Sequence, residues 1–218
     1  MNNESSTQKK TLLLVQFSIL VAIEAVVCLT PLGSLPALGP IVATLAAVPV
    51  IITAIIMGTG WGALMGFLFG FFSFIVWTFI PPGPAAFVFT PFYSVGDFSG
   101  NFWSLVICFV PRILIGVVTG LAYNLFKRIL KSHVGHDIIT FGLSGFLGSM
   151  TNTILVLVGI YFFFGESYAA EYGMAYSLLL SAIAGIVLTN GIPEAVLGAI
   201  AAFFIGRAVL KYQQFNLN

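Results

Sequence analysis

One arginine, Arg112, stands within the apolar run LVICFVPRILIGVV, far from any other charge in the chain. The remaining cations fall in three groups between or after apolar runs: Lys9 and Lys10, then Lys127, Arg128 and Lys131, and finally Arg207 and Lys211. A guanidinium is a planar fork of N–H donors that matches a carboxylate or a phosphate. Because burying a lone charge is costly, Arg112 is a candidate ligand-binding residue. The alternative is a structural tie to Glu24 or Glu194.

Three further polar residues lie in apolar surroundings. Asn152 is in TNTILVL, while Asn190 and Glu194 are in TNGIPEAV. In that second motif Gly191 and Pro193 interrupt the helical pattern and leave backbone groups available to a ligand. We therefore expect Asn190 and Glu194 to contact a ligand. Asn152 is either a ligand contact or an interhelical hydrogen bond that holds helices together.

Two aromatic residues complete the candidate site. Trp77 and Tyr93 flank the Pro-rich segment PPGPAAFVFTP and could form a wall for a ligand. Both could equally anchor the protein at the membrane interface, where Trp and Tyr gather. Catalytic chemistry has no comparable support: two histidines, Asp137 and Ser132 share one short polar loop. We expect no enzyme activity, no metal site and no cofactor.

The composition is that of a membrane protein. Hydrophobic residues make up 59% of the chain and charged residues 7%, and the mean hydropathy is +1.08. Residues 25–96 contain no charged residue, a length that accommodates two to three helical spans of about 20 residues each. A net charge of +1 offers no patch for nucleic acid. The expected fold is all-α and integral to the membrane.

The apolar runs predict six transmembrane helices. Gly58, Thr59 and Gly60 predict a tight hairpin between the second and third, and residues 81–103 form a Pro/Gly-rich segment that resembles a lid. An additional short helix at 174–188 is expected to dip in from the outer side. The predicted spans are 11–30, 39–57, 61–80, 104–126, 138–164 and 191–210.

Charge predicts the orientation. If the N-terminus is cytoplasmic, the group at Lys127 and the group at Arg207 both face the cytoplasm, as the positive-inside rule requires. The loop after the fifth helix, with Glu166 and Glu171, then lies outside. We expect a multi-pass plasma-membrane protein with both ends cytoplasmic: a tail at 1–10, one membrane domain at 11–210 and a tail at 211–218.

Helix geometry then estimates depth. At about 1.5 Å per residue, Arg112 lies roughly 12 Å below the outer start of its helix, and Asn152 roughly 21 Å above the inner start of its own. Asn190, Glu194, Trp77 and Glu24 fall at comparable heights. These residues predict a pocket that opens to the extracellular side. The inner half has few such groups, which argues against a stand-alone channel or carrier.

Small residues predict helix contacts. Ser18 and Ala22 form a small-xxx-small pair on the first helix, which allows another helix to approach closely. That helix could belong to a partner or to this chain. The glycines at four-residue spacing on the third helix are expected to pack against the second: Gly62, Gly66 and Gly70.

An ordered set of motifs resembles a known family. TPLG, WGALMGFLFGFFSF, VPRILIGVV, TNTILVL and NGIPEAV, over residues 11–210, are similar to the substrate-binding subunits of energy-coupling factor vitamin transporters. PFYSVG and GNFWSLVICFVPRILIG resemble the pantothenate-specific subunits most. The resemblance implies a vitamin-binding subunit that works with a transmembrane coupling subunit and two cytoplasmic ATPases, with Arg112 and Asn152 in the binding site.

The same resemblance implies that Ser18 and Ala22 contact the coupling subunit, since they occupy the place of the family's Ala-xxx-Ala motif, with serine replacing the first alanine. Alternative ligands on the same architecture are folate, a cobalamin precursor, riboflavin or a pyrimidine-type vitamin. A single carboxylate, an amide and hydroxyls make pantothenate the ligand that best fits one arginine, several asparagines and an aromatic wall.

Overall fold

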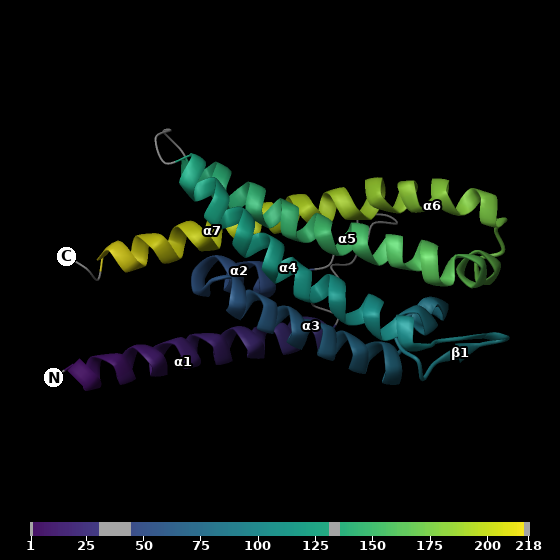
Figure 1. The fold of residues 1–218 in the computed structure, drawn as a ribbon, viewed down its shortest axis with the longest axis horizontal. Helices are drawn as coiled ribbons and strands as arrows, with labels where there is room; N and C mark the ends of the chain where they lie inside the picture. Colours follow the sequence, from purple (N-terminus) through teal and green to yellow (C-terminus); the bar gives the residue numbers. More distant parts are fainter. Residues whose placement is uncertain (1, 31–44, 131–135, 216–218) are drawn as a thin grey trace.

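The computed structural model describes residues 2–30, 45–130 and 136–215, and its regular structure is helical apart from one small hairpin (Figure 1). The long helices are α1 (Asn2–Leu29), α3 (Thr59–Phe79), α4 (Phe102–Ile129), α5 (His136–Glu171) and α7 (Ile192–Phe215). The short ones are α2 (Val48–Met57) and α6 (Leu179–Ile186), with η2 (Pro84–Val88), η3 (Tyr176–Leu178) and the π-helical turn η4 (Val187–Gly191). The strands β1 (Ser94–Val95) and β2 (Phe98–Ser99) pair antiparallel.

Five helical segments within the described residues are long and apolar enough to cross a membrane. They are Lys10–Leu29, Thr59–Phe79, Phe102–Ile129, Ile139–Glu171 and Tyr176–Ala208. The second predicted span begins at residue 39, but residues 39–44 lie outside the described part and α2 itself has ten residues. An all-α, multi-pass membrane protein is therefore confirmed, while the sixth span stays a prediction.

The predicted break before the last helix is wrong. The backbone continues in helical conformation from Leu179 through η4 into α7, and the N–H of Ile192 donates to the carbonyl of Val187, five residues back. This wider π-type turn keeps the helix continuous where Gly191 and Pro193 were expected to interrupt it. The expected dipping helix and the last span are thus one helix.

Other helices run longer than expected. The first begins at Asn2, within the predicted tail, and α5 continues to Glu171, so that Glu166 and Glu171 lie on its last turns rather than in a loop. The last helix extends to Phe215. The hairpin between α2 and α3 is confirmed: Gly58, with φ +97°, is the single residue between them.

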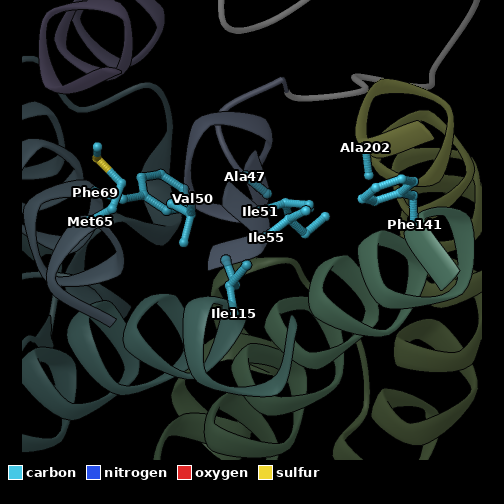
Figure 2. Packing of buried hydrophobic residues seen from close by; sticks show 9 residues of the cluster. All are labelled: Ala47, Val50, Ile51, Ile55, Met65, Phe69, Ile115, Phe141 and Ala202. Atoms are coloured by element: carbon cyan, nitrogen blue, oxygen red, sulfur yellow. The ribbon is translucent and has the colours of Figure 1, made fainter. Parts of the chain in front are cut away.

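The core consists of two apolar clusters. The first joins α2 to its neighbours, and Figure 2 shows Ile51 and Ile55 of α2 between Phe69 of α3 and Phe141 of α5. The second lies under residues 81–103, where the side chains of Phe87 and Val88 are completely buried against α4 and α5. We call them the α2 cluster and the lid cluster. Packing of the segment 81–103 over α4 and α5 holds the residues between the two clusters in place.

Glycines set the distance between α3 and α4. A Cβ at Gly66 would overlap the backbone carbonyl of Arg112, and one at Gly70 would meet Phe109 at 2.9 Å. Gly62 faces both Ala54 of α2 and Gly116 of α4. The expectation that these glycines pack against α2 is therefore correct only for Gly62, and the closest backbone approach is between α3 and α4.

Candidate functional site

Arg112 lies where the two apolar clusters meet. Its side chain is 6% exposed, and its Cζ is 5.7 Å from the ring centre of Phe69 and 5.1 Å from that of Phe89. Phe69 belongs to the α2 cluster and Phe89 to the lid cluster. A guanidinium between aromatic rings is favoured by the ring quadrupoles, the more so when water is excluded. The arginine is thus a buried cation in an aromatic cage.

The helix itself supplies one hydrogen-bond partner for this arginine. The Nη1 group of Arg112 donates to the backbone carbonyl of Ile107 at 2.7 Å. Pro111 lies inside α4, and because proline has no N–H it cannot donate to the carbonyl four residues earlier, which is that of Ile107. The carbonyl that Pro111 leaves without its usual helical donor is therefore the one that holds Arg112.

The two acidic candidates differ in their relation to Arg112. Glu194 is half-buried on the first turn of α7 and interacts electrostatically with the guanidinium. Glu24 is completely buried on α1, and its carboxyl group accepts a hydrogen bond from the Cys28 thiol at 3.1 Å. Of the two acids weighed as a tie, Glu194 remains the candidate partner of Arg112, since the carboxyl group of Glu24 is hydrogen-bonded to Cys28. Among the described residues, Nε of Arg112 and Oε2 of Glu24 are both buried without a hydrogen-bond partner.

Asn152 and Asn190 lie on facing helices. Asn152 is on α5 next to Thr153, whose side chain is the nearest neighbour of Gly191 at the end of η4, one residue after Asn190. The Oδ1 atoms of both asparagines are buried and have no hydrogen-bond partner among the residues described. A buried amide oxygen without a partner costs about 1–3 kcal/mol. The interhelical hydrogen bond considered for Asn152 is thus not made by its Oδ1, which suits a polar ligand instead.

Trp77 is joined to Arg112 through an aromatic stack. Its ring lies 4.5 Å from that of Phe89 at an interplanar angle of 26°, and Phe89 in turn faces the guanidinium. Tyr93 packs against the lid cluster near the hairpin. The structure thus brings Trp77 toward Arg112, whereas Tyr93 has no contact with Arg112 among those observed in the described residues.

The segment 81–103 is fastened on both sides. The hydroxyls of Thr78 and Thr90 lie 2.8 Å apart, and the Ser104 hydroxyl donates to the carbonyl of Phe87 at 2.7 Å. Asn101 and Ser104 form a reciprocal capping box at the start of α4. These bonds link the segment to α3 and α4 and set the height of Phe89 above Arg112.

Ser18 and Ala22 are exposed on α1, which contacts α2 and α3 at the edge of the bundle (Figure 1). The Ser18 hydroxyl bonds the carbonyl of Leu14 in its own helix at 2.9 Å. Among the side chains described for α1, Glu24 alone is buried. Both small residues thus face away from the chain's own helices, which makes packing within the chain a poor explanation for them.

Several groups that contact Arg112 were not predicted from the sequence. Phe69 and Phe89 are two of 22 phenylalanines, and no local pattern selects them. The carbonyl of Ile107 could have been predicted from the pair Pro111–Arg112. Within an apolar helix, this pair places the guanidinium close to a carbonyl whose usual N–H donor is missing because of the proline. Buried hydroxyls that the sequence did not single out occur on α2, α4 and α5: Thr53, Thr119, Thr140, Ser144 and Ser149.

The helices and the buried cation define a class, a multi-pass plasma-membrane protein with a polar site inside its bundle. Over residues 12–206 the chain matches the family "ECF transporter, substrate-specific component", and it belongs to that family. It is 36% identical to the "Pantothenic acid transporter PanT" of Lactococcus lactis subsp. cremoris over 173 residues, 79% of this chain and 80% of that protein.

A second relative extends the match over nearly the whole chain. The "Pantothenate transporter PanT" of Leuconostoc mesenteroides subsp. mesenteroides is 29% identical over 210 residues, 94% of this chain and 95% of its own length. The resemblance seen in the motifs is therefore confirmed at the level of the family.

Proposed function

We propose that this protein is the pantothenate-binding subunit of an energy-coupling factor importer rather than an enzyme or a stand-alone carrier. The observation that carries the proposal is the buried guanidinium of Arg112, whose Nε has no partner among the described residues, with Phe69 and Phe89 on either side of it. Nε and Nη2 form an edge that can bind a carboxylate through two parallel hydrogen bonds. The names of both relatives point to the same vitamin.

The remaining polar atoms suit the rest of the ligand. The amide oxygens of Asn152 and Asn190 can accept from the hydroxyl and amide donors of pantothenate, and the side chain of Trp77 can cover its apolar part. Glu194 interacts with Arg112, so a ligand carboxylate would compete with it for the guanidinium. We propose Tyr93 as a residue of the lid that closes the site.

Charge supports an orientation with both termini cytoplasmic. The start of α1 and the end of α7 lie at the same end of the molecule, opposite the hairpin β1–β2 (Figure 1). Exposed cations gather at the end that carries the termini: Lys10, Lys127, Arg128 and Arg207. Acidic residues mark the other end: Asp97, Glu166 and Glu171. By the positive-inside rule the site then opens toward the extracellular side.

Calorimetric titration of the purified protein with pantothenate tests the proposal, with riboflavin and folate as competing candidates. Mass spectrometry of ligand that co-purifies with the protein provides an independent identification. Saturable binding of pantothenate alone is the expected result. A co-purified vitamin without an anionic group would contradict the role given to Arg112.

The exposed pair Ser18 and Ala22 is proposed to contact the transmembrane coupling subunit, which in turn would work with two cytoplasmic ATPases. Small side chains allow close helix contact in a membrane, where packing rather than the hydrophobic effect drives association. The substitution Ala22→Trp is therefore expected to leave the affinity for pantothenate within about twofold of wild type. Uptake in vesicles with the coupling subunits should fall at least about tenfold, equivalent to about 1.4 kcal/mol of lost association.

The matched control for that substitution is Ile23→Trp. Ile23 is the next residue of α1, is 46% exposed and points about 100° away around the helix. It should leave both binding and uptake intact. Equal loss of uptake in the two variants would indicate a general effect of tryptophan on α1 and not a contact at Ala22.

A further inference from the structure

The buried arginine is held by a feature of its own helix. Pro111 cannot donate to the carbonyl of Ile107, and a proline ring inside a helix crowds the carbonyl four residues earlier. Nη1 of Arg112 donates to this same carbonyl at 2.7 Å. The acceptor thus lies five residues before the arginine, on the turn toward which helical side chains point.

This bond determines which edge of the guanidinium is left for a ligand. With Nη1 directed at Ile107, the edge formed by Nε and Nη2 faces the other way, and Nε has no hydrogen-bond partner within the described ranges. Phe69 and Phe89 lie 5.7 and 5.1 Å from Cζ and restrict the plane of the group. An arginine fixed in this way loses little side-chain entropy when an anion binds.

We propose that Pro111 is a positioning residue for the acidic ligand: by leaving the Ile107 carbonyl to Arg112, it presets the guanidinium with its Nε edge toward the ligand carboxylate. This inference rests on the proposed function. The proline itself touches no ligand and acts through Arg112 alone.

The test compares pantothenate with its alcohol analogue, in which CH₂OH replaces the carboxylate, on wild type and on Pro111→Ala. Alanine restores the N–H that competes for the Ile107 carbonyl. The variant should bind pantothenate about tenfold more weakly, while its affinity for the alcohol stays within about twofold of wild type. Its thermal stability should be unchanged or higher, because alanine is a far better helix residue than proline.

Equal losses for both ligands, or no loss for either, would overturn the inference. The double variant Pro111→Ala/Arg112→Ala gives a second check, since its acid-to-alcohol affinity ratio should equal that of Arg112→Ala alone. A further drop in that ratio would show that Pro111 acts through something other than Arg112. A wild-type protein that binds neither compound would instead refute the proposed function, and the inference with it.

Discussion

Replacing Arg112 by alanine is expected to weaken pantothenate binding by about 100-fold, because removing one partner of a buried charge pair costs about 2–5 kcal/mol. The side chain is 6% exposed and lies between two aromatic rings, so no water can take over its role without rearrangement of Phe69 or Phe89. Part of the loss comes from Glu194, which would keep a charge without its cation. Calorimetric titration of the purified variant measures the change.

Lysine at the same position separates charge from geometry. Arg112→Lys keeps the positive charge but lacks the fork that can hold the Ile107 carbonyl and a carboxylate at once. We expect an affinity between those of wild type and the alanine variant. Binding by Arg112→Lys as tight as wild type would show that charge alone matters and that the fork does not.

Arg128→Ala is the matched control for the alanine substitution. Arg128 is in the last turn of the same helix, and its side chain is exposed. Its removal should leave affinity within about twofold of wild type. Unchanged affinity in Arg112→Ala, with a lower melting temperature, would instead assign Arg112 a structural role as a tie to Glu194.

The position of Arg112 could be predicted because the membrane makes a lone charge expensive, and that cost depends only on the apolar residues around it. The boundaries of α3 and α4 could also be predicted, because they depend on the local apolar runs. The observed boundaries lie within about three residues of the predicted ones. The cage around the guanidinium could not be predicted in this way. Phe69 and Phe89 are 20 positions apart, and only the fold of the segment 81–103 over α4 brings them to one cation.

The break expected at Asn190 shows a second limit. Gly191 and Pro193 favour an interruption when only local preferences are weighed. In the folded chain, the close contact of Gly191 with Thr153 of α5 needs a residue without a side chain, and the π turn shifts the hydrogen-bond register across the site. The glycine therefore serves contact between helices, which depends on a partner 38 residues earlier in the chain.

The close approach of α3 to Arg112 leads to the second large effect. Gly66→Ala is expected to destabilise the protein by about 1–3 kcal/mol, because overpacking of a close contact forces the backbone to move. The added Cβ would overlap the carbonyl of Arg112 and lie 2.8 Å from Cα of Ile113, and neither backbone atom can swing aside as a side chain could. A chain of this length should lose several degrees in melting temperature, at about 2–4 °C per kcal/mol.

Because two of the three nearest obstructing atoms are backbone atoms of Arg112, the same substitution should also weaken pantothenate binding at temperatures where the variant is fully folded. Gly60→Ala is the matched control: Gly60 lies about 1.7 turns before Gly66 on α3, and a Cβ there would meet no atom within 4 Å. It should keep wild-type affinity and be as stable or more so, since alanine favours the helix. Comparable losses of affinity in both variants would indicate a general effect of alanine on α3. A loss of affinity in Gly66→Ala alone would show that the spacing of α3 and α4 positions the guanidinium.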